Sequence, residues 1–199
     1  MGLTKVTYSM IEGATFNVFD YGATGDGSTN DTAALQAALN AVPATGGAVY
    51  LPSGTYIITE SIVIKSNTLL FGDGNASQIK ASQSAFVGTL AGNSVYLVRN
   101  QNWTASVITD ENITIQNLSF NYGTVVIVGG GAHCISMRYV ENVKVVNCDF
   151  YNGENATAFL ATNNTLVDGC SAYDFINCAY DHWTSPSNAI VTNCYATTT

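Results

Sequence analysis

The chain has 199 residues, of which 47% are hydrophobic and only 10% are charged, and its formal net charge is −8. Its 6 Lys and Arg residues are outnumbered by 14 Asp and Glu residues, which argues against nucleic acid and anionic membrane surfaces as partners, because both require clustered basic side chains. The sequence has no apolar run of the roughly 18–20 residues that would insert into a membrane, and its start, MGLTKVTYSMIEGATF, lacks the apolar core of a classical signal peptide.

The first predicted elements lie in NVFDYGATGDGSTNDTAALQAALNAV, residues 17–42, which predicts a strand, a Gly/Asp turn and a short amphipathic helix. Asn30 or Asp31 can cap this helix, and its apolar side consists of Ala34, Leu35, Ala38 and Leu39. PATGG ends the helix before the predicted strand AVYLPSGTYIIT. The GDG stretch lacks the context of a dinucleotide or phosphate site, and Asp26 and Asp31 lack the spacing of a calcium loop, so we expect turns there.

Beyond the helix, the second half of the chain contains an internal repeat of nine residues. The units are NITIQNLSF from Asn112, NVKVVNCDF from Asn142, NTLVDGCSA from Asn164 and NAIVTNCYA from Asn188, and NTLLFGDGN from Asn67 is a weaker member. Small or apolar residues fall at the second, fourth, seventh and ninth positions of each unit. This alternation is typical of strands with one buried face, with a slip of one residue between the two halves.

The slip predicts a sharp corner at the sixth position, which is occupied by Asn117, Asn147, Gly169 and Asn193. Asn and Gly adopt a left-handed backbone at the lowest cost, so each unit is expected to be two short strands around a corner. Stacked units of this kind form a parallel β-solenoid, and a third strand of each coil should precede the leading Asn. The short helix would then cover the apolar interior that the first coil leaves open.

Five cysteines occur, at positions 134, 148, 170, 178 and 194, and their odd number argues against a fully paired disulfide scaffold. Cys148, Cys170 and Cys194 share the seventh position of three successive units. Stacked Cβ atoms point in parallel, which strains a disulfide, so we expect a buried row of thiols. With no CxxC pair and only 2 histidines, no zinc site is expected.

Residues 16–66 resemble the N-terminal signature of the pectate-lyase-like right-handed parallel β-helix superfamily, in the branch that includes rhamnogalacturonase/epimerase-like domains and phage tailspikes or depolymerases. The leader TKVTYSMIEGA is similar to the segment that precedes the β-helix in such phage proteins. The resemblance implies an all-β, right-handed parallel β-helix with a short N-terminal capping α-helix. We expect a leader over residues 1–15 and the β-helix domain over 16–199, with family members running several coils further.

Such proteins bind extended glycans along one sheet and act on them with carboxylates, so we examine the predicted third strands for outward-facing acids. In DHW, an acid, a titratable base and a sugar-stacking aromatic are adjacent, and alternation places Asp181 and Trp183 on one face with His182 on the other. The candidate catalytic residues are Asp181, Asp174, Glu154 and His182, with Asp149 secondary, and the candidate substrate-binding residues are Trp183 and Arg138. His133 is expected at a turn or strand start, and Trp103 and Tyr122 in packing, with glycan stacking as the alternative for both rings.

Two functions remain open. The first is a polysaccharide lyase or glycoside hydrolase of phage tailspike type, and the second is a non-catalytic glycan-binding or structural tail or adhesin module. The resemblance implies a polysaccharide substrate or receptor, a homotrimer, and an extracellular or virion-tail location. No cofactor is expected from the residues, and the resemblance implies Ca²⁺ only if the reaction is that of a lyase.

Overall fold

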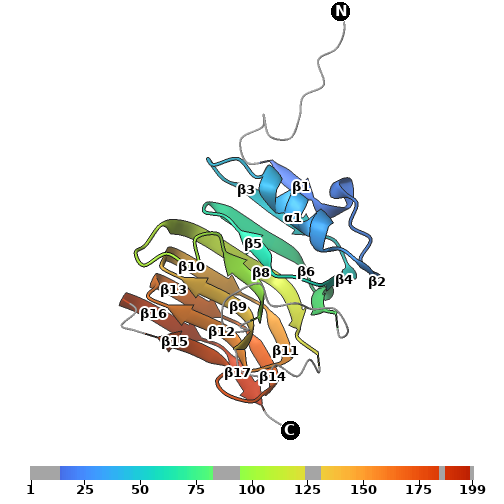
Figure 1. The fold of residues 1–199 in the computed structure, drawn as a ribbon. Helices are drawn as coiled ribbons and strands as arrows, with labels where there is room; N and C mark the ends of the chain where they lie inside the picture. The colour runs from blue at the N-terminus through green and yellow to red at the C-terminus, as the bar shows by residue number, and fades with distance from the viewer. Residues whose placement is uncertain (1–13, 83–94, 124–130, 184–186, 198–199) are drawn as a thin grey trace, which may run out of the picture.

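The repeat units wind into the coils of a right-handed parallel β-helix, in a computed structural model that describes residues 14–82, 95–123, 131–183 and 187–197 (Figure 1). The fold prediction, an all-β solenoid with a short N-terminal capping helix, is confirmed. In chain order the elements are β1 (Thr15–Asn17), a 3₁₀ turn (Val18–Tyr21), β2 (Asp26–Asn30), α1 (Thr32–Ala41), β3 (Gly47–Leu51), β4 (Gly54–Ile58), β5 (Ile62–Ile64), β6 (Thr68–Ala81), β7 (Val95–Asn100), β8 (Asp110–Asn121), β9 (Ala132–Arg138), β10 (Val140–Val146), β11 (Asp149–Gly153), β12 (Asn155–Leu160), β13 (Asn163–Asp168), β14 (Ser171–Phe175), β15 (Tyr180–Trp183), β16 (Ser187–Thr192) and β17 (Tyr195–Thr197).

The strands form two sheets in which neighbours come from successive coils and run parallel. Sheet A has 12 strands along the path β1-β3-β6-β8-β10-β13-β16, with β2, β4, β11, β14 and β17 attached beside it. Sheet B has 5 strands in the order β5-β7-β9-β12-β15. Each later coil therefore gives sheet B one strand before it enters the repeat unit, as predicted for the third strand.

The corner predicted at the sixth repeat position is present in every unit. Asn117, Asn147, Gly169 and Asn193 have φ of 53°, 50°, 63° and 51°. The leading Asn of each unit is also left-handed, with φ between 49° and 59°, which the sequence analysis did not anticipate. The left-handed Asn residues therefore recur at two fixed positions of the repeat, where an ordinary L-residue would be strained.

The leading Asn residues form a ladder of side-chain amides along the solenoid. Each Nδ2 donates to the Oδ1 of the preceding coil, over 2.9 Å from Asn112 to Asn67, 2.9 Å from Asn142 to Asn112, 3.2 Å from Asn164 to Asn142 and 2.9 Å from Asn188 to Asn164. The first amide, that of Asn67, donates to the carbonyl oxygen of Ala44 over 3.1 Å. The ladder thus joins the stacked coils to the segment that follows the capping helix.

The interior consists of stacked rows of like side chains. Phe120 and Phe150 stack with ring centroids 5.3 Å apart. The described cysteines are all free thiols. Cys148 and Cys170 are buried, and their Sγ atoms donate to the backbone oxygens of Ile115 (3.8 Å) and Val145 (3.6 Å) of the preceding coil. The predicted row of free thiols is confirmed, although Cys194, in the last described coil, is only partly buried. Burial raises the pKa of the Cys148 thiol well above its usual range.

Helix α1 covers the N-terminal end of the solenoid, where Figure 1 shows it lying across the first strands. Leu35, Ala38 and Leu39 are buried beneath it. Gln36 lies beside β5, the edge strand of sheet B: its Nε2 donates to the carbonyl oxygen of Val63 over 3.0 Å, and its Oε1 accepts from the Val63 amide over 2.8 Å. Gln36 therefore satisfies the backbone groups that a further strand would otherwise bond.

The start of helix α1 distinguishes the two predicted caps. The Oδ1 of Asn30 accepts from the Thr32 amide over 3.1 Å, whereas Asp31, although at the N-cap position, makes no capping bond. The Asp31 carboxylate instead accepts from the amides of Thr24 (2.7 Å) and Gly25 (3.1 Å) and closes the preceding turn. Asn30 is therefore the side chain that caps the helix.

At the other end, β15, β16 and β17 pair with a neighbour on one side only, within the part of the chain that the structure describes. Ala189 and Val191 of β16 are exposed there, whereas Val143 and Val145 at the same repeat positions of β10 are fully buried. Among the described residues no helix is long and apolar enough to cross a membrane.

We predict that Asn142→Ala lowers the free energy of unfolding by about 3–4 kcal/mol, because Ala at this left-handed φ costs roughly 1–2 kcal/mol and the two ladder hydrogen bonds of Asn142 are lost at about 1 kcal/mol each. Asn142→Gly should lose less, because glycine adopts the same backbone without strain. The check is urea denaturation, with exposed Lys144→Ala on the same strand as the control, which should change stability by less than about 0.5 kcal/mol. Equal losses for Ala and Gly would contradict the role given to the backbone.

We also predict that Gln36→Leu exposes the Val63 amide to faster hydrogen exchange and lowers stability by about 1–3 kcal/mol, because both backbone groups of the β5 edge lose their partner. Ala37→Ser, at an exposed position of the same helix, is the control. Unchanged protection of Val63 in the Leu variant would mean that Gln36 does not seal this edge.

Candidate functional site

The outer face of sheet B brings side chains from four coils into two rows. The strand register places Arg99, Ser136, Ala158 and Asp181 side by side in one row. Arg138, Leu160 and Trp183 form the second row, two residues further along β9, β12 and β15. Buried side chains of Ile135, Met137 and Phe159 alternate with these positions and face the core. Both rows therefore face away from the core.

A cavity of about 210 Å³ opens on this face. It is lined by Tyr96, Trp103, His133, Ser136, Arg138, Ala158, Phe159, Leu160 and Trp183. The Trp183 side chain is 52% exposed, which leaves much of an indole ring open to a ligand. The combination of aromatic walls and a few polar groups is typical of small-molecule and sugar sites.

Trp103 lies over the sheet because the segment after β7 folds back across it. Its Nε1 donates to the Oγ of Ser136 over 3.0 Å, and its ring centroid is 5.1 Å from that of Tyr96. Asp110 anchors this segment, since its Oδ2 accepts from the Asn102 amide over 2.8 Å and from Asn100 Nδ2 over 2.6 Å. Trp103 is thus held as one wall of the cavity, in addition to the packing role predicted for it.

Arg138 is placed by two aromatic rings. Its Cζ lies 4.8 Å from the centroid of Trp103 and 5.5 Å from that of Tyr139. Its Nε is buried without a hydrogen-bond partner, and no ion pair joins it to a carboxylate among the described residues. The guanidinium is therefore a positioned cation whose bidentate donor geometry suits a carboxylate or sulfate group.

Asp181 and Glu154 are the carboxylates nearest to this face. The Oδ2 of Asp181 accepts from Asn155 Nδ2 over 2.9 Å, and Asn155 is buried and accepts from Asn177 in turn over 3.2 Å. Glu154 precedes β12, and its Oε2 accepts from the backbone amide of Ala132 over 3.1 Å. Each carboxylate is therefore held by one of its oxygens.

His133 belongs to the site although the sequence analysis gave it no role beyond a strand start. It lies near the start of β9, buried, with its ring 5.3 Å from Tyr96, and it pairs in register with Asn155. Burial lowers its pKa, an effect that the charges of Glu154 and Asp181 partly oppose, so the ring is neutral at neutral pH. Aligning the third strands AHCISM and ENATAF by register would have placed His133 beside Asn155.

The structure separates the other two predicted catalytic residues from the cavity. His182 turns toward the core, with its ring 5.1 Å from Phe159 and edge-on to it, and burial lowers its pKa. Asp174 is exposed on β14, which belongs to sheet A, as does β11 with Asp149. The structure thus brings Asp181, Trp183 and Arg138 to one face, and the catalytic roles of all the candidates stay predictions.

A calcium ion takes six or more oxygen ligands, which carboxylates, carbonyl oxygens and waters can supply. Among the described residues, no group of three or more His, Cys, Asp or Glu side chains is arranged to hold a metal ion. Asp181 and Glu154 each have one oxygen engaged inside the protein. The calcium ion expected for a lyase therefore stays a prediction.

Comparison with known proteins gives relatives of two kinds. Over 67 residues the chain is 48% identical to mannuronan C5-epimerase AlgE3 of Azotobacter vinelandii, which covers 30% of this chain and 4% of the epimerase. Over 184 residues it is 27% identical to the pre-neck appendage protein of Bacillus phage phi29, which covers 80% of this chain and 20% of the phage protein. The chain thus spans a fifth or less of the length of these curated relatives.

The fold has close counterparts among solved structures. The surface adhesin PfbA of Streptococcus pneumoniae superimposes with a TM-score of 0.66 at 22% sequence identity, over 80% of this chain and 39% of the adhesin. Residues 15–197 match the family described as rhamnogalacturonase A/epimerase, pectate lyase-like. Because this match takes in all the coils of the solenoid and its capping helix, the chain belongs to the rhamnogalacturonase A/epimerase, pectate lyase-like family.

Proposed function

We propose that the outer face of sheet B binds an extended polysaccharide and that Asp181 takes part in cleaving it. The observation that carries the proposal is the shared outer face of three coils, on which Arg138 and Trp183 line one aromatic cavity and Asp181 is the register neighbour of Ala158, which also lines it. A strand spacing of about 4.8 Å places successive side chains at intervals along which a glycan chain can lie.

Binding rests on the aromatic rings and on Arg138. Trp183 and Trp103 offer ring faces on which the apolar side of a sugar can stack, while Ser136 offers a polar group within the cavity. Arg138 receives a carboxylate of the glycan, because its guanidinium is desolvated and has no carboxylate partner among the described residues. These contacts fix the sugar beside Asp181.

Cleavage uses the carboxylates in one of two ways. In a hydrolase, one carboxylic acid protonates the leaving oxygen and a second carboxylate activates water or attacks, and Asp181 with Glu154 supplies that pair. In a lyase, Asp181 removes the C5 proton beside a uronate carboxyl whose charge Arg138 neutralises. The electron pair forms the C4–C5 double bond, the C4–O bond to the next sugar breaks, and the leaving oxygen takes a proton from water.

The relatives support a polysaccharide as the ligand and a phage particle as one setting. The epimerase relative acts on mannuronan by its name, and the phage relative is an appendage protein. We therefore propose a place in a virion tail of tailspike type, and a homotrimeric assembly as the family resemblance implies.

A non-catalytic glycan-binding module is the second candidate. The observation in its favour is that each carboxylate already has an internal hydrogen bond, Asp181 to Asn155 and Glu154 to the Ala132 amide. Such bonds stabilise a binding surface as well as they orient a catalyst.

We predict that Asp181→Asn lowers the rate of polysaccharide cleavage by roughly 10²–10⁴-fold, the usual contribution of a positioned acid or base. The assay incubates the protein with bacterial capsular, alginate and pectic polysaccharides and follows reducing ends together with the ultraviolet absorbance of unsaturated uronate. Reducing ends without absorbance would identify hydrolysis, and absorbance would identify a lyase.

Glu111→Gln is the matched control, because Glu111 is an exposed carboxylate on β8 of sheet A. Asp174→Asn, run in parallel, tests the prediction made for that residue from sequence. Glycan binding without cleavage, lost in Trp183→Ala and kept in Asp181→Asn, would favour the binding module and contradict the catalytic role.

A further inference from the structure

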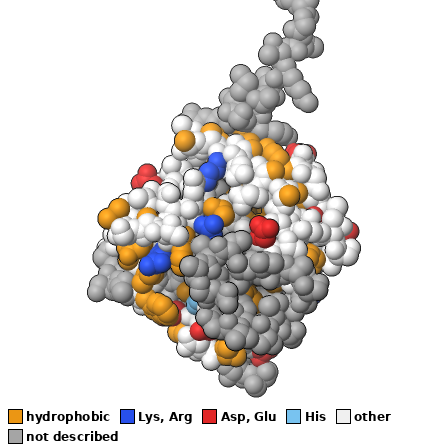
Figure 2. All heavy atoms as spheres, in the orientation of Figure 1, with side chains coloured by type: hydrophobic (Ala, Val, Ile, Leu, Met, Phe, Trp, Pro, Cys, Tyr) orange, Lys and Arg blue, Asp and Glu red, His pale blue; other side chains and the backbone are white. Residues whose placement is uncertain are grey.

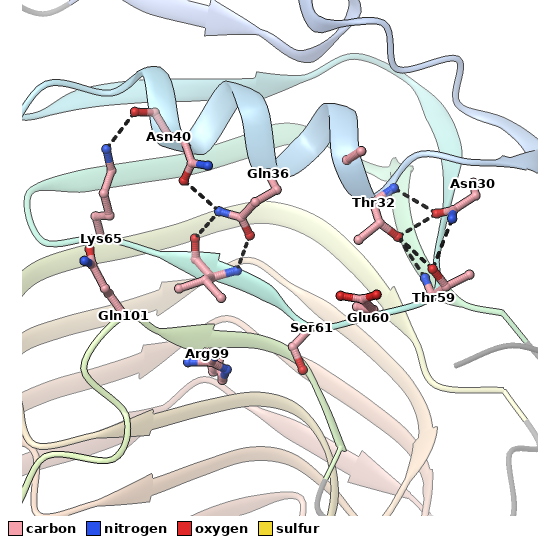
Figure 3. Close-up of a pocket in the computed structure, with 12 residues that line it drawn as sticks. Asn30, Thr32, Gln36, Asn40, Thr59, Glu60, Ser61, Lys65, Arg99 and Gln101 are labelled. Atoms are coloured by element: carbon pink, nitrogen blue, oxygen red, sulfur yellow. Dashed lines mark hydrogen bonds between the residues drawn. The ribbon is translucent and has the colours of Figure 1, made fainter. Parts of the chain in front are cut away.

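A second, larger hollow lies beside the aromatic cavity, between helix α1 and sheet B (Figure 3). Its volume is about 680 Å³, within the range of ligand pockets. The helix lines one wall, and the opposite wall consists of Val63 on β5, Lys65 directly after it and Arg99 on β7. We call this hollow the cap groove.

Arg99 is a half-buried cation in the cap groove whose charge is not paired with a carboxylate in the described part of the chain. Its Nη1 donates to the carbonyl oxygen of Asn100 over 3.3 Å, and its Nε is buried without a hydrogen bond among the described residues. No carboxylate forms an ion pair with it among the described residues, and Glu12 is the sole acid of the sequence outside them. Burial lowers the pKa of Arg99, yet a guanidinium stays protonated in water at neutral pH. A partly desolvated, unpaired cation favours an anionic ligand.

A second basic side chain, Lys65, lies at the same end of the cap groove as Arg99, and the acidic residue lies at the other end. Lys65 Nζ donates to the carbonyl oxygens of Asn40 (2.9 Å) and Val42 (2.6 Å), so one of its three N–H groups remains for a ligand. The acid of the groove, Glu60, lies beside Thr59, at the opposite end from Lys65 (Figure 3). The end of the groove near Arg99 and Lys65 is therefore basic.

The cap groove and the aromatic cavity are joined through one residue pair. Arg99 lines the groove, Ser136 lines the cavity, and the two are register partners on β7 and β9. Figure 2 shows Lys and Arg side chains in a row down this face of the molecule. Lys65, Arg99 and Arg138 are half of the 6 basic residues in a chain of net charge −8. Basic side chains that gather on one face of an acidic chain create a local positive potential, which favours an anionic ligand there.

We propose that Arg99 and the basic end of the cap groove bind an acidic group, a carboxylate or a sulfate, on a sugar unit of the same polysaccharide chain, remote from the unit at Trp183. From β15 to β7 the chain would cross three strand spacings, about 14 Å, which is several sugar units. The inference rests on the proposed function and adds a charged subsite, which restricts the ligand to an anionic glycan long enough to reach the helix.

The test is isothermal titration calorimetry with short and longer oligogalacturonates, their methyl esters of the same lengths, and sulfated galactan oligosaccharides. Arg99→Gln should weaken binding of the longer acidic oligosaccharides by roughly 10- to 100-fold, the range of a lost charge-assisted hydrogen bond. It should leave the methyl esters and the shortest oligomers unchanged, because these do not place a charge in the groove. A larger loss for the carboxylated or for the sulfated ligand would identify the group that is bound.

Lys144→Gln is the matched control, because it removes the same charge from an exposed position on sheet A. Trp183→Ala separates the two proposals. If Trp183→Ala loses binding and Arg99→Gln binds every acidic oligomer as the wild type does, the subsite is wrong and the proposed function stands. If Arg99→Gln weakens esters and acids equally, or the wild type binds no acidic oligomer, the subsite is also overturned. If neither variant changes the binding of any glycan, both proposals fail.

Discussion

The structure depends on one backbone constraint, the left-handed conformation that recurs at two Asn or Gly positions of each repeat. These corners let both halves of the nine-residue unit keep their apolar side chains inward, so Val143, Val145 and Phe150 all reach the core. Without them the period-two alternation would turn half of each unit toward solvent. Sheet B, the strand register and the cavity all follow from coils that close in this way.

The same constraint explains what could be predicted from the sequence. The corners at Asn117, Asn147 and Asn193 were predicted because the apolar alternation shifts by one residue there, and a left-handed corner keeps the apolar side chains of both halves facing inward. The free thiol row and the helix that covers the first coil followed from stacking alone. The amide ladder was not predicted, because a repeated Asn shows that a position matters but not that its side chain bonds the next coil.

The candidate site was predicted less completely, for reasons visible in particular residues. Alternation placed Asp181 and Trp183 on one face correctly, and the same alternation placed His182 on the other, where it packs against Phe159. His133, Trp103 and Arg99 carry no local signal, because they meet across coils separated by segments of unequal length. Contacts of this kind depend on which residues of neighbouring coils lie side by side, and the sequence of a single repeat unit does not show this.

The amide ladder has a direction, and this bears on how such a solenoid changes in length. Every Nδ2 donates toward the capped end, and the series terminates on the Ala44 carbonyl oxygen. Since each rung has the same chemistry, a whole coil inserted or removed between Asn142 and Asn164 would leave identical junctions on both sides. Growth by duplication of coils therefore needs no compensating change in the cap, whereas a fraction of a coil would interrupt the ladder and both sheets at once.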